Sequence, residues 1–240
     1  MTDAPVALVT GGARRVGAAI SRALAARGMH VAVHYHRSEA EAQALVAELR
    51  TAGMSATAFT ADLSDPHAPA ALVHAVADRL GGLDVLVNSA ANFLRTPMGS
   101  VSLEQWESVF ALNVRAPFFA TQAAAERMRE GGVIINMADL AAFEQWSGYI
   151  PHGISKAAIV QLTRAAAHTL APRIRVNAIA PGVVLLPEGW DDQSEARLTA
   201  TTPLKRTGSP EDVVHALLYL VDATFVTGEV LIVDGGRQIR

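Results

Sequence analysis

The chain has 240 residues, a formal net charge of −3 and 50% hydrophobic residues, a size that favours one α/β domain over residues 1–240. The absence of cysteine excludes disulfides, thiol nucleophiles and Cys-based metal sites. Lys and Arg are scattered, so a nucleic-acid partner is not expected. No basic leader precedes the first apolar run and no apolar stretch could span a bilayer, so we expect a cytoplasmic protein with no membrane partner.

Short apolar runs alternate with helical patterns along the chain. A helical pattern over residues 16–26 ends at Gly28, and Ser38 and Glu41, three residues apart, predict a capping box for a helix to residue 50. The runs predicted as strands are residues 6–9, 31–35, 56–60, 85–88, 133–137, 175–179 and 230–233. Seven strands alternating with helices predict an α/β fold of the Rossmann type, a doubly wound parallel sheet with helices on both faces.

Residues 183–203 form the least regular stretch, rich in Pro, Gly, Asp and Thr, and they follow the sixth predicted strand. Ligands of such folds bind beyond the carboxyl ends of the strands, so this stretch is predicted to be a substrate loop. The alternative is an ordinary surface loop with a short helix. Ser209 followed by Pro210 predicts the start of the next helix.

The turn over residues 10–17 lies between the first strand and the first helix. There a helix N-terminus and backbone N–H groups would face an anion such as a pyrophosphate. The turn resembles the Thr-Gly-X-X-X-Gly-X-Gly motif of the short-chain dehydrogenase/reductase family, with Arg15 where the pattern has Gly. A Gly-rich turn alone is a weak signal, and a plain tight turn is the alternative.

The second strand is followed by His36, Arg37 and Ser38, with Arg14 available from the first turn. A free 2′-OH is usually bound by a carboxylate here, whereas a 2′-phosphate requires cations, so the cofactor is predicted to be NADPH. The alternatives are a solvated Arg37 and, for His34 and His36, an adventitious metal pair. No metal site is expected.

His152 and Lys156 stand one helical turn apart, in His-Gly-Ile-Ser-Lys-Ala-Ala. With tyrosine at position 152 the segment would match the catalytic motif of the short-chain reductases, so the chain resembles that family over nearly its whole length with one acid exchanged. The resemblance implies that Asn113 supports Lys156 through water. The cofactor contacts it implies are Gly11, Arg14, Arg15, Val16, Gly17, His36, Arg37, Ser38, Asp62, Leu63, Asn88, Ser89, Ala90, Lys156, Pro181 and Gly182.

Asp139 stands thirteen residues before His152, where ordinary members of the family have serine. Together with the two arginines of the first turn and the residues after the second strand, it makes the chain similar to the pteridine reductases. That resemblance implies a substrate site of Arg15, Phe93, Asp139 and His152, with Phe93 stacking on a pterin. The alternatives are that Asp139 only caps a helix and that Phe93 is plain packing.

The charge of His152 decides what it can do. Lys156 and a helix N-terminus disfavour the protonated ring, whereas Asp139, if close, favours it, so sequence leaves both states open. Reducing a ketone leaves an alkoxide that needs a good acid, whereas a ring imine leaves a nitrogen that is protonated more easily. Tyr149, seven residues before Lys156, is expected to lie outside the helix and not to replace the missing tyrosine.

The sequence therefore predicts an NADPH-dependent reductase that delivers hydride to a C=N bond of a small dihydropterin-like or dihydrofolate-like substrate. Asp139, His152, Lys156 and Asn113 are its predicted catalytic residues. One alternative is a carbonyl or 3-oxoacyl reductase with protonated His152 as acid, and another is a catalytically weak NADPH-binding protein. The resemblance also implies a homo-tetramer in which Arg240 contributes to a neighbour's site.

Overall fold

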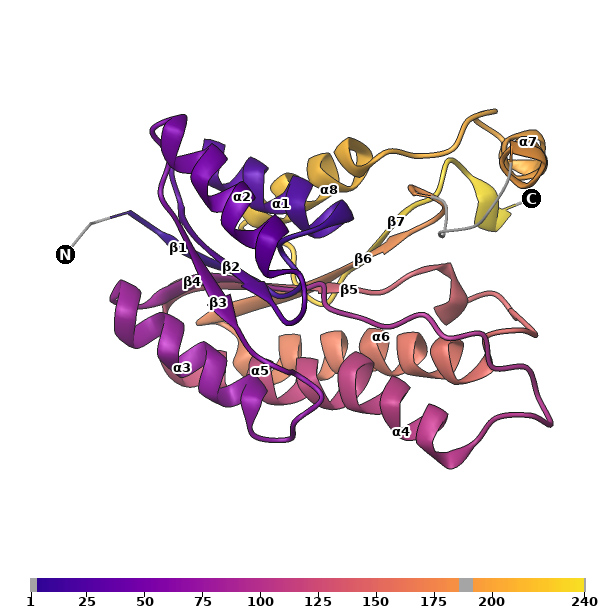
Figure 1. The fold of residues 1–240 in the computed structure, drawn as a ribbon, viewed down its shortest axis with the longest axis horizontal. Helices are drawn as coiled ribbons and strands as arrows, with labels where there is room; N and C mark the ends of the chain where they lie inside the picture. Colours follow the sequence, from indigo (N-terminus) through magenta and orange to yellow (C-terminus); the bar gives the residue numbers. More distant parts are fainter. Residues whose placement is uncertain (1–3, 186–191, 240) are drawn as a thin grey trace.

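The computed structural model describes residues 4–185 and 192–239, with the backbone alone for residues 192–195. Its strands form one parallel seven-stranded sheet in the order β3-β2-β1-β4-β5-β6-β7 (Figure 1). The strands are β1 (Val6–Val9), β2 (His30–Tyr35), β3 (Ala56–Thr60), β4 (Leu83–Asn88), β5 (Met128–Met137), β6 (Ile174–Pro181) and β7 (Val230–Val233). Every predicted strand is present, so the predicted doubly wound α/β fold is confirmed.

Helices cover both faces of the sheet (Figure 1). One layer holds α1 (Arg15–Ala26), α2 (Glu39–Thr51) and α8 (Pro210–Asp222), and the other holds α3 (Ala68–Leu80), α4 (Leu103–Phe110), α5 (Ala116–Arg127) and α6 (Ile150–Leu170). The helix α7 (Asp192–Thr201) lies beyond the sheet, near the C terminus. Three short turns of helix complete the order: η1 (Ala111–Arg115), η2 (Leu140–Ala142) and η3 (Arg237–Ile239).

The core is built on both faces of the strands. All four residues of β1 are buried, alternating between a cluster shared with α1, α2 and α8 and a cluster shared with α3 and α5. Parallel strands buried on both sides read as continuous apolar runs, which is why the sequence locates them well.

The two predicted helix starts differ in outcome. Ser209 precedes Pro210 at the start of α8 as predicted, and its backbone N–H donates to Asp212 Oδ2 at 2.8 Å. The capping box predicted at Ser38 is wrong, because that residue has φ −95° and ψ 53°, outside the extended region of an N-cap, and its side chain accepts no capping hydrogen bond. Glu41 instead lies 3.7 Å from the Nε of Arg14.

The strand order reverses beside β1, which pairs with β2 on one side and β4 on the other. In open parallel sheets this reversal opens a crevice at the carboxyl ends of the strands. The turn after β1, the end of β4 and the segment after β5 therefore meet at one edge, where the predicted site residues lie.

Candidate active site

The turn after β1 needs glycine at two positions. Gly11 has φ +64°, and a Cβ there would lie 3.1 Å from the Ala90 Cα. A Cβ on Gly17 would lie 2.2 Å from the carbonyl oxygen of Gly11, so any side chain would push α1 away from the strand end. The glycines thus bring the N-terminus of α1 against the turn, a cradle that fits a pyrophosphate. Val16, in the first turn of α1, is half-buried.

Arg15 takes the place of a glycine and adopts the conformation that glycine favours, with φ +51°. Non-glycine residues are rare in this left-handed region, at a cost of roughly 1 kcal/mol. The exposed side chain reaches across the site, and its Nη2 donates to the Leu185 carbonyl at 3.3 Å. The departure from the family pattern therefore places a cation at the mouth of the site.

His34 anchors the same turn, a role that the sequence analysis missed. Its Nδ1 accepts the backbone N–H of Gly11 at 3.0 Å, and its Nε2 donates to the carbonyl of Ala61 at 3.1 Å. Burial lowers the pKa of His34 to about 4, more than the bond to Ala61 raises it, and His36 lowers it further. The sequence signal that could have revealed this role is a polar residue, His34, within an otherwise apolar strand.

The predicted phosphate-binding residues lie at the exposed end of β2. His36 Nε2 lies 3.7 Å from Asp62 Oδ2. Hydrogen bonds from the Ser64 hydroxyl and N–H lower the pKa of Asp62 more than its slight burial raises it, and His36 and Arg37 lower it further. The described residues contain no group of three or more His, Asp or Glu side chains that could hold a metal ion.

The end of β4 is held by its own hydrogen bonds. The side chain of Asn88 is buried and donates to Asn136 Oδ1 in β5 at 2.8 Å and to Thr121 Oγ1 in α5 at 3.3 Å. The N–H groups of Ser89 and Ala90 donate to the hydroxyl of Thr10. Thr10 was not among the predicted site residues.

The remaining predicted cofactor contacts frame the crevice. Leu63 and Pro181 are buried, and the N–H of Gly182 donates to the Val233 carbonyl at 2.9 Å. A Cβ on Gly182 would lie 3.0 Å from Asp234, so β6 and β7 end in close contact there.

Asp139 and His152 form a direct pair, with His152 Nε2 2.6 Å from Asp139 Oδ2. The other ring nitrogen, Nδ1, lies 3.4 Å from the amide nitrogen of Asn113. The Asn113 amide is oriented by Asn92, whose N–H donates to Asn113 Oδ1 at 2.9 Å. Nδ1 therefore accepts, and the proton on Nε2 is donated to the carboxylate.

Three side chains hold this pair in position: Asn113 in the turn η1, Ser155 in α6 and Asn92. Asn113 lies in the π-helical turn η1, a distortion often found at functional sites, and it donates directly to Ser155 Oγ at 3.2 Å. Ser155 in turn donates to the His152 carbonyl at 2.6 Å. Asn113 therefore contacts His152 and Ser155 directly, whereas the resemblance implied support of Lys156 through water. Asn92 and Ser155 were not among the predicted residues.

Asp139 is ionised in spite of its surroundings. Burial alone would raise its pKa, but the hydrogen bond from His152, the charge of Lys156 and the Ala141 N–H outweigh burial and lower the pKa below its ordinary value. The bond to Ala141 also makes Asp139 the N-cap of η2, so the capping alternative holds together with the pairing to His152. Burial lowers the pKa of Lys156, although Asp139 opposes this, and its Nζ donates to the Met137 carbonyl at 2.8 Å.

An aromatic cluster adjoins the pair. Phe93 stacks on Tyr149, with ring centroids 4.2 Å apart and planes 13° apart, and meets His152 edge to face at 4.8 Å. Trp146 lies against both Phe93 and His152. Tyr149 is the N-cap of α6 and so lies outside the helix, as expected from its spacing.

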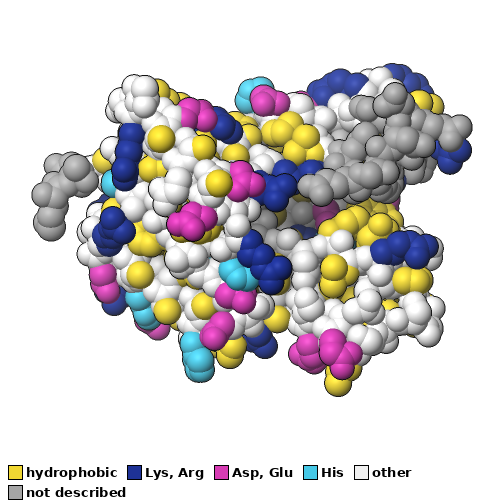
Figure 2. Space-filling model, viewed as in Figure 1, with side chains coloured by type: hydrophobic (Ala, Val, Ile, Leu, Met, Phe, Trp, Pro, Cys, Tyr) yellow, Lys and Arg dark blue, Asp and Glu magenta, His cyan; other side chains and the backbone are white. Residues whose placement is uncertain are grey.

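These groups surround a cavity of about 890 Å³ at the carboxyl edge of the sheet. Figure 2 shows the molecule hollowed on this side, between the two helical layers. The lining residues are Arg15, Phe93, Arg95, Asp139, Gln145, Trp146, Ser147, Gly148, Tyr149, Gly182, Val183, Leu185, Leu198 and Arg237. Asp139 lines the cavity with 21% of its side chain exposed, whereas His152, 3% exposed, lies behind it.

The predicted loop over residues 183–203 contributes Val183, Leu185 and Leu198 to the cavity, the last from α7. Residues 186–191 of that loop and Arg240, expected near a neighbouring subunit, lie outside the described residues.

Comparisons with known proteins place this site in a family. The family described as enoyl-(acyl carrier protein) reductase matches residues 11–238. A 3-oxoacyl-[acyl-carrier-protein] reductase of Synechocystis sp. is 34% identical over 239 residues, which cover 97% of this chain and 96% of the relative. The chain belongs to the short-chain dehydrogenase/reductase family.

Two solved structures of similar proteins contain a nicotinamide cofactor. The FolM alternative dihydrofolate reductase 1 of Brucella canis, complexed with NADP, is 32% identical with a TM-score of 0.93, covering 98% of this chain and 94% of that one. A blue fluorescent protein from a metagenomic library, in complex with NADPH, is 39% identical with a TM-score of 0.91 and 97% of each chain covered. This chain is therefore similar to proteins named as a 3-oxoacyl reductase, a dihydrofolate reductase and a fluorescent protein.

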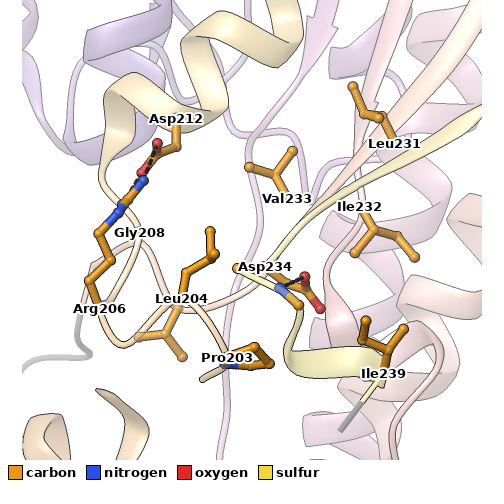
Figure 3. A pocket seen from close by; sticks show the side chains of 13 residues that line it. Pro203, Leu204, Arg206, Gly208, Asp212, Leu231, Ile232, Val233, Asp234 and Ile239 are labelled. Atoms are coloured by element: carbon orange, nitrogen blue, oxygen red, sulfur yellow. Dashed lines mark hydrogen bonds and ion pairs between the residues drawn. The ribbon is translucent and has the colours of Figure 1, made fainter. Parts of the chain in front are cut away.

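A second hollow lies beside the edge strand β7, apart from the predicted site (Figure 3). Its wall is largely apolar, with Leu204, Leu231 and Ile239 among the lining side chains, and Arg206 is paired with Asp212 at 2.7 Å. None of the residues predicted to be catalytic in this short-chain reductase lines it.

Proposed function

We propose that this short-chain reductase uses NADPH to reduce a C=N bond of a dihydropterin-like or dihydrofolate-like ring. The NADP-bound and NADPH-bound structures of similar proteins support the cofactor. So do the glycine cradle after β1, Arg14 in that turn and Arg37 just after β2. When bound, the cofactor supplies the hydride.

The observation that carries the choice of substrate is the ionised Asp139 facing the cavity in front of His152. Both ring nitrogens of His152 are engaged, one by Asp139 and one by Asn113. His152 therefore has no free N–H to offer a substrate, and Asp139 is the group that a substrate meets.

A buried carboxylate beside a ring nitrogen favours the protonated form of that nitrogen. A protonated C=N group accepts hydride at carbon and leaves a neutral amine, with the proton drawn from solvent, so no strong acid is required afterwards. A ketone oxygen is too weakly basic to be protonated beforehand in this way, so its reduction leaves an alkoxide that needs a separate acid. The pair of Asp139 and His152 thus suits an imine better than a ketone.

The other residues have positioning roles in this proposal. Lys156 would hold the nicotinamide ribose, and its positive charge keeps Asp139 ionised. Arg15 and Phe93 would hold the substrate ring, Phe93 offering a ring face that now stacks on Tyr149. Asn113 holds His152 in the tautomer that donates to Asp139.

The second candidate is a carbonyl or 3-oxoacyl reductase, favoured by the likeness to the Synechocystis enzyme. It would require a protonated His152, so its rate would fall with rising pH, and His152→Tyr would match or exceed the original ketone activity. The third candidate, a catalytically weak NADPH-binding protein, predicts tight NADPH binding with no oxidation of the cofactor by any substrate.

The deciding experiment measures NADPH oxidation with 7,8-dihydrobiopterin, dihydromonapterin and dihydrofolate, and in parallel with a panel of ketones and a 3-oxoacyl thioester. We expect turnover of at least one dihydropterin and slower turnover of the ketones. Turnover of ketones alone would overturn the proposal in favour of the second candidate.

Assembly as a homo-tetramer and a place in the cytoplasm remain part of the proposal. No helix in the described ranges has the length and apolar character needed to cross a membrane. Light scattering on the purified protein tests the tetramer directly.

A further inference from the structure

Arg237 is a half-buried cation that the proposed function does not use. It belongs to η3 near the C terminus, its side chain is 14% exposed, and it lines the same cavity as Asp139. Its Nε and Nη1 are buried and have no hydrogen-bond partner among the described residues. The acid beside it, Glu144, has its Oε1 3.6 Å from the Arg237 Nε.

The backbone around Arg237 is fixed by Asp234. The N–H of Gly236 donates to Asp234 Oδ1 at 2.7 Å, and the N–H of Gln238 donates to Asp234 Oδ2 at 2.6 Å. One carboxylate therefore binds the chain on both sides of Arg237. The backbone at Arg237 is held in place beside the cavity, although the Nε and Nη1 donors of its side chain lack acceptors among the described residues.

The charge of the cavity is unbalanced. Among the described residues, three guanidinium groups line it, those of Arg15, Arg95 and Arg237, against the carboxylate of Asp139. Glu144 is not part of the lining, and its Oε2 accepts the Trp146 Nε1–H at 2.8 Å. Buried guanidinium donors without acceptors are costly, and a carboxylate is the group that satisfies them best.

We propose that Arg237, with Arg95 on the same cavity wall, binds a carboxylate on the part of the substrate that does not react. This inference rests on the proposed reduction of a dihydropterin ring and narrows the substrate class. The substrate carries an acidic side chain, as dihydrofolate does in its glutamate, and is not a pterin with a neutral side chain such as dihydrobiopterin.

The test compares two substrates that share the reacting ring. In the NADPH-dependent assay, Arg237→Met raises the ratio of the KM for dihydrofolate to the KM for 7,8-dihydrobiopterin about tenfold, the effect of losing a charged hydrogen bond. Arg164→Met removes the same charge from an exposed position of α6 and leaves the ratio within twofold of the original. An unchanged ratio in Arg237→Met overturns the inference.

A second variant tests the same site in case Arg237→Met does not fold. Glu144→Gln removes the negative charge that faces Arg237 but keeps an acceptor for Trp146. We expect it to lower the KM for dihydrofolate relative to dihydrobiopterin, because the guanidinium then attracts the substrate carboxylate without competition. A ratio that stays the same or rises in Glu144→Gln counts against the carboxylate site.

A binding measurement separates this inference from the proposed function. Calorimetry with folate and NADP⁺ requires no turnover, and Arg237→Met is expected to weaken folate binding about tenfold. If neither dihydropterin is reduced but folate binding depends on Arg237, the proposed function fails and the carboxylate site stands. If dihydropterins are reduced and folate binds equally to both proteins, or not at all, the carboxylate site fails alone.

Discussion

At the scale of single residues, His152 and Asp139 have different roles in the proposed reaction. His152 is shielded and gives its proton to Asp139, which faces the cavity. Asp139→Asn is expected to lower kcat/KM for a dihydropterin about 10²-fold, because an amide cannot stabilise a protonated ring nitrogen. Steady-state kinetics at neutral pH, with circular dichroism to confirm folding, measures this loss. Activity near the original level in Asp139→Asn would contradict the role given to the carboxylate.

The pH dependence of the same pair is a separate prediction. The pKa of Asp139 is lowered, so activity that needs the carboxylate persists to below its ordinary value of 3.8 and is lost as pH falls through the lowered pKa. In His152→Phe, burial is no longer opposed by that hydrogen bond, so the pKa of Asp139 rises and the acidic limb moves to higher pH. The pH profile of kcat/KM shows the shift. Complete loss of turnover at every pH would instead indicate that His152 is itself the acid.

Arg15 combines a conformational cost with a place in the substrate site. Arg15→Gly and Arg15→Ala remove the same guanidinium, but glycine alone relaxes the backbone at φ +51°. Arg15→Gly is therefore expected to exceed Arg15→Ala in free energy of unfolding by about 1 kcal/mol. Urea denaturation of the two variants measures the difference. Equal stabilities would show that the left-handed conformation carries no cost here.

At the scale of elements, His34 ties β2 to the turn after β1 and links fold stability to pH. Its pKa falls from 6.5 to about 4 on folding, so folding favours the neutral ring. As pH drops from 6.5 to 4, the unfolded chain takes up a proton that the folded chain does not. The free energy of unfolding therefore decreases over this interval, by at most about 3 kcal/mol from this residue.

Chemical denaturation between pH 4 and 7 tests this linkage in His34→Gln. The variant is expected to lack the His34 share of the decrease, although it starts from a lower stability because Gly11 loses its acceptor. His168→Gln, at an exposed position of α6 that does not act on His34, is the matched control and should keep the original slope. The same slope in all three proteins would show that His34 does not control it.

The elements also show what sequence can predict. Buried parallel strands produce apolar runs, and all seven predicted runs lie in strands. The capping box at Ser38 failed because the spacing of Ser and Glu does not determine the backbone angles of Ser38, and Glu41 lies against Arg14 instead. The contact between Asn113 and His152 depends on a π-helical turn, for which the sequence carries no pattern.

At the scale of the whole molecule, the site joins segments that are far apart in the chain. Motif spacing identifies Asp139 and His152 as candidates, because Asp139 stands thirteen residues before His152 and Lys156 follows His152 by one helical turn. Arg237 could not be found in this way, because its burial results from the C-terminal turn folding against residue 144. Long-range packing of this kind depends on the complete fold.

Cofactor choice is the last consequence of this assembly, because folding places Arg37 at the end of β2 beside the glycine turn. A ligand that binds only the folded state raises stability by mass action, about 2.7 kcal/mol at one hundred times its Kd. NADPH is therefore expected to raise the Tm more than NADH at equal concentration. Arg37→Ala should reduce the NADPH effect to the NADH level, since the 2′-phosphate then loses a cation.

Differential scanning calorimetry with each cofactor measures these shifts. Arg27→Ala is the matched control, because Arg27 follows α1 and pairs with Asp222 at 2.7 Å, away from the strand ends that form the site. Its own Tm is expected to fall slightly, but the difference between NADPH and NADH should be preserved. Equal Tm shifts with NADPH and NADH in the unmodified protein would mean that the 2′-phosphate does not contribute to cofactor binding. A difference that survives in Arg37→Ala would instead assign the phosphate to other cations of the cradle, such as Arg14.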